Sequence, residues 1–149
     1  MVYKCNITKR SFTMWRIVFC SYEDSNEEYI PHMMHSCECR GEGTNGAWYN
    51  EDGDTPTGVV MGHTIELGYP EESYGPYKRI ALDELVSGDF KEAYEQYGRS
   101  GIQIHGGRDQ SHLWNTHGCV RIFDKDIKKI TDHIYKYCKE IGKITINEQ

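Results

Sequence analysis

The sequence lacks a long apolar run, an excess of basic charge, and any internal repeat or low-complexity tract. Because a helix needs about 20 apolar residues to cross a bilayer, no segment is expected to span a membrane. The net charge of −6 argues against a nucleic-acid partner, whose binding depends on clustered lysines and arginines. Residues 1–10 also lack the apolar core of a secretory signal. We therefore expect a protein that stays inside, has lost a signal, or uses another export route.

The composition is that of one domain spanning residues 1–149. Hydrophobic residues make up 38% and aromatic residues 12%, which is enough apolar side chain to close one core. Residues 41–58 are dense in Gly, Asn, Asp and Thr and predict a turn-rich connection. Runs rich in β-branched and aromatic residues, or with clear alternation, predict strands at 12–22, 33–40, 59–67, 101–105 and 143–146.

Two segments have the spacing of helices. The first begins at a cap formed by Ser87 or Asp89 and ends at Gly98, because glycine tolerates the left-handed conformation of a helix terminus. The second runs from Asp124 to near Gly142. Each carries an apolar stripe that we expect to pack on the core, with Phe90, Ala93, Tyr94 and Tyr97 in the first and Ile127, Ile130 and Ile134 in the second.

Residues 101–105, Gly-Ile-Gln-Ile-His, alternate between apolar and polar. On a strand, Ile102 and Ile104 point to one face, and Gln103 and His105 point to the other. If the isoleucines face the core, His105 stands on the opposite face at a strand end, just before two glycines. This placement makes His105 a candidate catalytic side chain.

A second candidate segment is Thr-His-Gly-Cys-Val-Arg at residues 116–121. A cysteine attacks a carbonyl as the thiolate, so it needs a base within hydrogen-bond reach and donors aimed at the oxyanion. Cys119 is the candidate nucleophile, and the amides of Gly118 and Cys119 are candidate oxyanion donors. Arg121 is a candidate brace for the loop or partner for a substrate carboxylate.

His105 and His117 are both candidates for the base, and geometry has to decide between them. Taken singly, a cysteine is usually a small hydrophobic residue, and a lone histidine or arginine is usually structural. Their combination, with glycines on both sides, favours catalysis.

Together these segments resemble the signature of the L,D-transpeptidase (YkuD-type) catalytic domain family. In that signature a histidine-glycine strand end, here His105-Gly-Gly, precedes a Ser/Thr-His-Gly-Cys segment closed by Arg or Asn, here residues 116–121. Asp54-Thr-Pro-Thr-Gly58 resembles the family's Thr-Pro-x-Gly turn, and Tyr74-Gly-Pro-Tyr77 resembles its Gly-Pro segment. The similarity runs from about Thr55 to Ile130 in the family's order.

The resemblance implies a mainly β fold, a sandwich of mixed sheets with two packed helices. It implies that Cys119 is the nucleophile, that His105 is first the base and then the acid, and that the Gly106 carbonyl orients His105. The remaining positions that it assigns are His117 and Gly118, which shape the oxyanion region, and Arg121, which braces the loop.

The implied reaction is acyl transfer on peptidoglycan stem peptides, without a metal or organic cofactor. Cys119 attacks the amide after the third, diamino-acid residue of a tetrapeptide stem, expels the terminal D-alanine and forms a thioester. A neighbouring stem amine then gives a 3,3 cross-link, water gives L,D-carboxypeptidase activity, and a free D-amino acid gives exchange. The site of action is then the cell envelope or periplasm. An effector directed at a rival's wall would be paired with an immunity protein.

The candidate substrate-binding residues lie around this signature. His117 follows His105 by twelve positions, which is short for the family, so the segment 108–115 that would border the groove is abbreviated. Packing is the alternative explanation for the aromatic members. The candidates are His63, Tyr74, Tyr77, Arg108 and Trp114.

A rival constellation stands at residues 32–39, where two imidazoles and two thiols fall within eight residues. The alternative from another class is therefore a zinc-stapled binding module that uses His32, His35, Cys37 and Cys39. On a strand, however, His32 points away from the other three, and a strand with inward-facing thiols explains them equally. The six cysteines also permit disulfides, and the sequence leaves open the oxidation of Cys5, Cys20, Cys37, Cys39 and Cys138.

A third interpretation keeps the fold and loses the enzyme. An inactive descendant would have no need to retain His105, Cys119 and Arg121 together, so we place it behind the enzyme.

Overall fold

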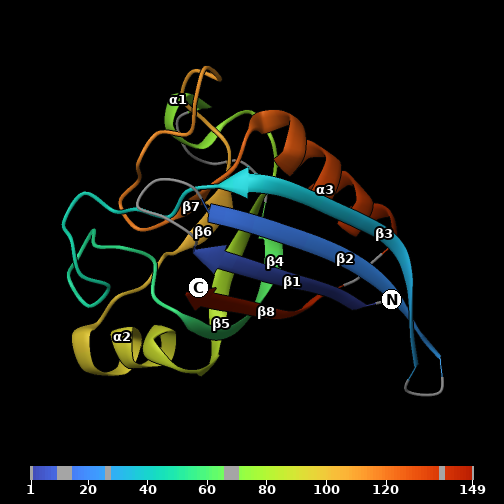
Figure 1. Cartoon of the computed structure of the whole chain (residues 1–149), viewed down its shortest axis with the longest axis horizontal. Helices are drawn as coiled ribbons and strands as arrows, with labels where there is room; N and C mark the ends of the chain where they lie inside the picture. The colour runs from blue at the N-terminus through green and yellow to red at the C-terminus, as the bar shows by residue number, and fades with distance from the viewer. Residues whose placement is uncertain (1, 10–14, 26–27, 66–70, 138–139, 149) are drawn as a thin grey trace.

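The protein is described from a computed structural model (Figure 1). The structure describes residues 2–9, 15–25, 28–65, 71–137 and 140–148, and for residues 2–4, 15–25, 28–34, 71, 137 and 140 it describes the backbone alone. In chain order the elements are β1 (Val2–Lys9), β2 (Trp15–Ser25), β3 (Glu28–Cys39), β4 (Gly58–Ile65), α1 (Glu71–Tyr74), β5 (Arg79–Ser87), α2 (Asp89–Tyr97), β6 (Gln103–His105), β7 (Val120–Arg121), α3 (Asp124–Tyr137) and β8 (Glu140–Glu148).

The strands form one mixed sheet in the order β3-β2-β1-β8-β4-β5-β6-β7. At its centre β1 and β8 run parallel, with Ile7 opposite Ile146, and β8 runs antiparallel to β4, with Val60 opposite Ile144. These four side chains are at most 1% exposed. Branched side chains favour strands because they pack well on a pleated surface, so this register builds the middle of the core.

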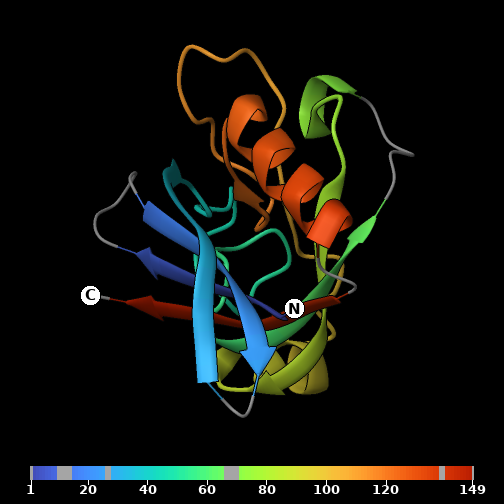
Figure 2. The ribbon, with the colours of Figure 1, turned by 90° about the vertical axis from the view of Figure 1, so that its right-hand side faces the viewer.

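The sheet curls until its two ends meet. Arg40, directly after β3, bridges Arg121 of β7. The Arg40 amide donates to the Arg121 carbonyl at 2.9 Å, and the Arg121 amide donates to the Arg40 carbonyl at 2.7 Å. In Figure 1, β1, β2, β3 and β8 run across the view while β4 and β5 cross behind them. Figure 2 shows α3 above and α2 below these strands.

Helix α2 packs against β4 and β5 through Phe90 and Ala93, which are buried. Its N-cap is Gly88, which makes no side-chain capping bond. At its other end Gly98 has φ 72°, the left-handed conformation that closes the helix. The Gly98 and Arg99 amides then satisfy the carbonyls of Tyr94 and Ala93, each at 3.0 Å.

Helix α3 covers β4, β5 and β6 with one isoleucine stripe. Ile127, Ile130 and Ile134 are 1%, 0% and 2% exposed. Two acidic residues, Asp124 and Asp126, occupy its first turn, where a negative charge is favourable beside the positive end of the helix dipole.

The predicted mainly β fold with mixed strand directions and packed helices is confirmed. The left-handed end at Gly98 and the isoleucine stripe are also as predicted. Tyr94 and Tyr97 are not core residues, since they are 54% and 52% exposed.

Element boundaries differ in several places from the sequence prediction. Neither Ser87 nor Asp89 caps α2, and α3 ends at Tyr137 rather than near Gly142 because β8 already begins at Glu140. Strand β2 extends to Ser25, three residues beyond the predicted end at residue 22, and β5, β7 and α1 were not predicted. Cys138 lies outside the described residues.

Within the described ranges, no helix combines the length and the apolar composition needed to cross a bilayer.

Shortening Ile130 to alanine should lower the free energy of unfolding by about 2–5 kcal/mol, because its side chain is fully buried and a cavity would remain. Lys129→Ala, at the neighbouring exposed position of α3, is the control and should change it by less than about 0.5 kcal/mol. Urea unfolding followed by circular dichroism measures both. Similar effects at the two positions would contradict the packing of α3 described above.

Candidate active site

The pairing of β6 with β7 brings the two candidate segments together. These strands are parallel, with Ile104 opposite Val120 and His105 opposite Arg121. Cys119 precedes Arg121 by two positions, so its side chain shares the face of Arg121 and of His105. The register thus places Cys119, the residue just before β7, and His105, the last residue of β6, at neighbouring positions of the sheet edge.

His105 is buried, with 3% of its surface exposed. Its Nδ1 lies 2.6 Å from the Gly106 carbonyl oxygen, which can only accept a hydrogen bond. This contact assigns the proton to Nδ1 and leaves Nε2 as an unprotonated acceptor. Burial lowers the pKa of His105 to about 4; the Gly106 contact raises it, and the charges of Arg121 and Arg79 lower it further. The imidazole is therefore neutral near pH 7.

Cys119 is half-buried, and its sulfur lies 3.8 Å from the Gly101 carbonyl oxygen. The backbone of Gln103 also hydrogen-bonds to the Cys119 sulfur. Burial raises the pKa of Cys119, while the backbone of Gln103 and the charges of Arg121, Arg99 and Arg79 oppose the increase. At rest, both the thiol of Cys119 and the imidazole of His105 are therefore neutral near pH 7.

Arg121 braces the site from within. It is 5% exposed, and its guanidinium donates to the carbonyls of Gly106 at 3.3 Å, Asn115 at 2.9 Å, Trp114 at 3.1 Å and Ser73 at 2.8 Å. The Gly106 carbonyl oxygen therefore accepts hydrogen bonds from both His105 and Arg121. With its donors committed to backbone, Arg121 has the geometry of a brace rather than of a substrate-carboxylate partner.

The loop before Cys119 is held by threonine hydroxyls. Thr116 Oγ1 accepts from the Gly118 amide at 3.0 Å and donates to the Cys119 carbonyl at 2.6 Å. The Gly118 amide is thus already engaged, and of the two expected oxyanion donors the Cys119 amide is the one outside this contact. Thr55 is fully buried, and its hydroxyl proton is shared between the Gly118 carbonyl oxygen, 2.6 Å from Oγ1, and the Gly41 carbonyl oxygen, 3.0 Å away.

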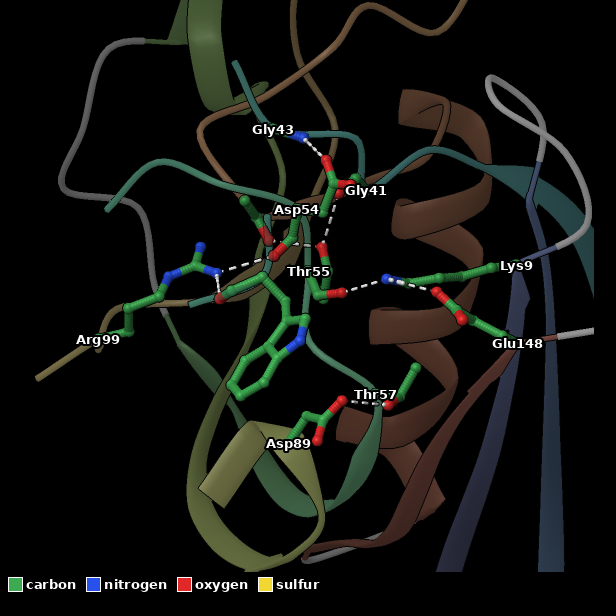
Figure 3. Close-up of polar contacts among 11 residues, drawn as sticks. Lys9, Gly41, Gly43, Asp54, Thr55, Thr57, Asp89, Arg99 and Glu148 are labelled. Carbon is green, nitrogen blue, oxygen red and sulfur yellow. Dashed lines mark hydrogen bonds and ion pairs between the residues drawn. The ribbon is translucent and has the colours of Figure 1, made fainter. Parts of the chain in front are cut away.

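Charged side chains flank the turn at Asp54 and Thr55 (Figure 3). On one side Arg99 donates to the carbonyls of Asp54 at 2.8 Å and Gly53 at 3.0 Å, and also to that of Trp48. On the other side Lys9 donates to the Thr55 carbonyl. The turn that carries the loop is therefore fixed by contacts from β1 and from the end of α2.

Two glycines follow His105 because Asp124 and α1 come too close for side chains. A Cβ on Gly106 would lie 2.1 Å from Asp124 Oδ1, and one on Gly107 would lie 2.3 Å from the Ser73 carbonyl oxygen. Gly107 also has φ 101°, and its amide donates to Asp124 Oδ1 at 2.8 Å. The first residue of α3 thus fixes the end of the histidine strand.

Cys119 lines a cavity of about 330 Å³. A second cavity of about 460 Å³ shares Arg99, Ser100, Gly101 and Ile102 with the first and continues between β5 and α2. His105 lines neither. The other residues of the first cavity are Glu51, Asp52, Tyr97, Gly98 and His117.

The two candidate bases differ in their surroundings. His117 is exposed and its Nδ1 lies 3.5 Å from Asp52 Oδ1, at the outer side of the cavity. His105 is buried with its tautomer set by Gly106. The geometry therefore favours His105 as the base.

The residues predicted to bind substrate do not gather around one cavity. Tyr74 contacts His105, with ring centroids 4.7 Å apart, whereas His63 is exposed beside Asp83. Arg108 lies over the ring of Trp114 at 4.9 Å, and neither residue lines the two cavities. Tyr77 packs on the hydrophobic core.

Sequence reasoning missed Arg99 and Arg79. Arg99 follows the helix-ending glycine and reaches backbone 45 to 51 positions earlier, which no local pattern reveals. Arg79 is 1% exposed and lies 5.0 Å from the centre of the Tyr74 ring. An arginine at the start of an apolar strand run was the available signal for it.

The rival zinc set is only partly assembled. Cys39 is fully buried within the hydrophobic core cluster, and Cys37 packs against it. His35 turns instead toward Asp126 of α3, with Nε2 and Oδ1 3.1 Å apart. The side chain of His32 lies outside the described part of the structure. Cys37, Cys39 and Cys119 are free thiols.

The model of the YkuD L,D-transpeptidase catalytic domain matches residues 40–142, more than half of the chain. The chain belongs to the L,D-transpeptidase catalytic domain family. The L,D-transpeptidase match begins at Arg40, the residue that closes the curled sheet onto β7.

Two solved structures share this fold. They are the helical cell shape determining protein Pgp2 from Campylobacter jejuni and a single-substitution mutant of it, both with a TM-score of 0.58. Sequence identity is 14% and 15%, and the similarity covers 99% of this chain but 49% and 48% of theirs. The chain thus spans about half the length of these proteins, and the likeness concerns the fold alone. No curated protein matches the sequence significantly.

Stability should depend on the protonation of His105. Because burial lowers its pKa from 6.5 to about 4, the unfolded chain binds more protons than the folded chain between these values. The contribution of His105 is complete above about pH 6.5 and is lost as the pH falls toward about 4, by about 3 kcal/mol in total. His105→Gln should remove this part of the pH dependence, measured by urea unfolding across the window. Parallel pH profiles for the parent and the variant would contradict it.

The hydroxyl of Thr55 should matter more than that of Thr57. Thr55→Val keeps the shape but leaves the buried Gly118 carbonyl without its donor, so we expect a loss of about 1–3 kcal/mol in the free energy of unfolding. Thr57→Val, which removes a half-buried hydroxyl 3.3 Å from Asp89, is the matched control and should cost less than about 1 kcal/mol. The reverse order would be inconsistent with the loop anchoring described here.

Proposed function

We propose that the protein is a peptidoglycan L,D-transpeptidase in which Cys119 forms a thioester with the donor stem and His105 transfers the protons. The observation that carries this proposal is the buried His105, whose Nδ1 is engaged by Gly106 and whose face is shared by Cys119. A cysteine acyltransferase needs this combination, a thiol beside an imidazole that is oriented through its other nitrogen.

The first step starts from the neutral pair. As the sulfur attacks the carbonyl carbon between the diamino acid and the terminal D-alanine, the thiol proton passes to His105 Nε2. The oxyanion is received by the Cys119 amide. His105 then returns the proton to the departing amine, D-alanine leaves, and the thioester remains.

The second step uses the same groups in reverse. An amine of a neighbouring stem attacks the thioester, His105 accepts its proton, and the thiol is regenerated when the 3,3 cross-link forms. Water in place of the amine gives an L,D-carboxypeptidase, and a free D-amino acid gives exchange. These outcomes share one thioester and differ only in the acceptor.

The low pKa of His105 suits this mechanism. The imidazole is unprotonated throughout the neutral range, so the base is always available. Two arginines disfavour the imidazolium, and so it exists only while the proton is in transit. A proton held briefly by a buried histidine is readily given to the leaving group.

The cavity has the charges for a stem peptide. Arg99 lines it beside Cys119, and Glu51 and Asp52 line it at the exposed side. A donor stem carries both a carboxylate and a side-chain amine on its diamino acid. The cavity thus presents charges of both signs, which supports binding of such a doubly charged ligand.

The proposed target places the activity at the cell envelope or periplasm. One protein with this fold, Pgp2, determines helical cell shape, which supports a substrate in the cell wall. Whether the wall is the cell's own or a rival's, with an immunity protein in the second case, stays a prediction from the sequence.

Muropeptide mass spectrometry tests the proposal. Disaccharide tetrapeptides incubated with the reduced parent should lose D-alanine and give cross-linked dimers or tripeptides, and the intact protein should carry a thioester adduct. Cys119→Ala should abolish product and adduct, and His105→Gln should lower turnover by about 10²–10⁴-fold.

The control is His117→Gln, which changes the exposed histidine of the same cavity. It should retain most of the turnover. If His117→Gln loses as much as His105→Gln, the assignment of the base is wrong. If the folded, reduced parent gives neither product nor adduct, the enzyme is excluded for this substrate class.

A further inference from the structure

A second cluster of reactive side chains lies away from the candidate active site. Among the described residues, His35, Cys37 and Asp126 form a group whose ligand atoms all lie within 4.8 Å of one another. Two of them come from β3 and the third from the first turn of α3. The mechanism proposed above uses none of them.

We propose that His35 Nε2, Cys37 Sγ and an Asp126 carboxylate oxygen bind one zinc ion, which links β3 to α3. Residues 35 and 37 are two apart on a strand, so their side chains share a face and reach the same point. Asp126 approaches that point from the helix. An imidazole, a thiol and a carboxylate are the three ligand types that zinc accepts in proteins.

The spacing is close to that of a zinc site. With Zn–S near 2.3 Å and Zn–N and Zn–O near 2.1 Å, tetrahedral ligands lie roughly 3.3–3.6 Å apart. His35 Nε2 and Asp126 Oδ1 are 3.1 Å apart, and the sulfur is within 4.8 Å of both. Small side-chain rotations are therefore enough to bring the three atoms to one ion.

The cluster is enclosed but reachable. The side chains of His35 and Asp126 are 14% and 12% exposed, and Cys37 is half-buried. A hydrated ion can thus enter, and a water molecule fills the fourth tetrahedral position. Enclosure also strengthens each bond between the ion and its anionic ligands, because the surrounding dielectric is low.

This ligand set differs from the one suggested by the sequence alone. Cys39 is buried in the core cluster, and Asp126, which is 91 positions after His35, takes its place. The competing explanation is a metal-free His35–Asp126 ion pair beside a neutral thiol. Only the zinc site predicts that Cys37 binds as a thiolate.

The position of the cluster suggests what the ion does. Arg40, which pairs with Arg121, follows Cys37 by three positions, and Asp124, which holds the Gly107 amide, precedes Asp126 by two. An ion between β3 and α3 would therefore stabilise two supports of the catalytic loop without taking part in the reaction. The zinc-site proposal and the acyl-transfer proposal are therefore independent, and either can fail without the other.

Cobalt substitution tests the site in the whole, reduced chain. One equivalent of Co²⁺ should produce the intense near-ultraviolet absorption of a sulfur-to-cobalt bond in the parent. Cys119→Ala should keep this band, because it removes the thiol of the candidate active site and leaves Cys37 in place. Cys37→Ser should lose the band. Zinc should raise the melting temperature of the parent and of Cys119→Ala by several degrees, and leave that of Cys37→Ser unchanged.

Asp126→Asn is the second variant, chosen because the amide still hydrogen-bonds to His35. It should fold and bind zinc at least about tenfold more weakly than the parent, as measured by chelator competition. The proposal is overturned if the parent and Cys119→Ala show no cobalt–sulfur band, or if the band depends on Cys119. Zinc affinity unchanged in Asp126→Asn would also reject this ligand set, and it would do so even if Cys37→Ser did not fold.

Discussion

The guanidinium of Arg121 is the contact on which the candidate site depends. It is a buried charge whose donors end on four carbonyls, from α1, from the turn after β6 and from the segment before Cys119. The backbone of Arg121 pairs with that of Arg40 and thereby joins the two ends of the curled sheet. A buried cation without such acceptors would be very costly. The carbonyls of these segments therefore stabilise the buried guanidinium, and the guanidinium in turn fixes the positions of the segments.

In the candidate site, the groups that fix the backbone differ from the groups proposed to react. Charged groups such as Arg121, Arg99 and Asp124 bind backbone, whereas the two groups proposed to react are neutral at rest. His105 owes this neutrality mainly to burial, and its orientation to one carbonyl. The same burial that holds the imidazole in place therefore also sets its proton affinity.

Some of this structure follows from short-range patterns. The isoleucine stripe of α3 and the end of α2 at Gly98 depend on residues a few positions apart, and the structure agrees with both. The alternation at 101–105 predicted the burial of Ile102 and Ile104 but not that of His105. Strand β5 was missed because its burial does not alternate; it has four buried residues followed by mostly exposed ones. The order His-Cys-Arg, at residues 105, 119 and 121, predicted the candidate site through a family resemblance, but it did not show how the parts of the site are held. Arg99 acts on backbone far away in sequence, and the engagement of the Gly118 amide by Thr116 is a matter of three-dimensional geometry alone.

The central strand β8 has a consequence for how the molecule is made. In the sheet order it lies between β1 and β4, so the half containing β1, β2 and β3 joins the half containing β4 to β7 through residues 140–148. The pairing of β1 with β8 closes a loop of more than a hundred residues, which is slow because distant segments must meet. On the ribosome, the sheet cannot be completed until this strand has emerged. Cys119 and His105 are synthesised earlier, but the core beneath them waits for β8, so a nascent chain carries its reactive thiol before it has a finished site to use it.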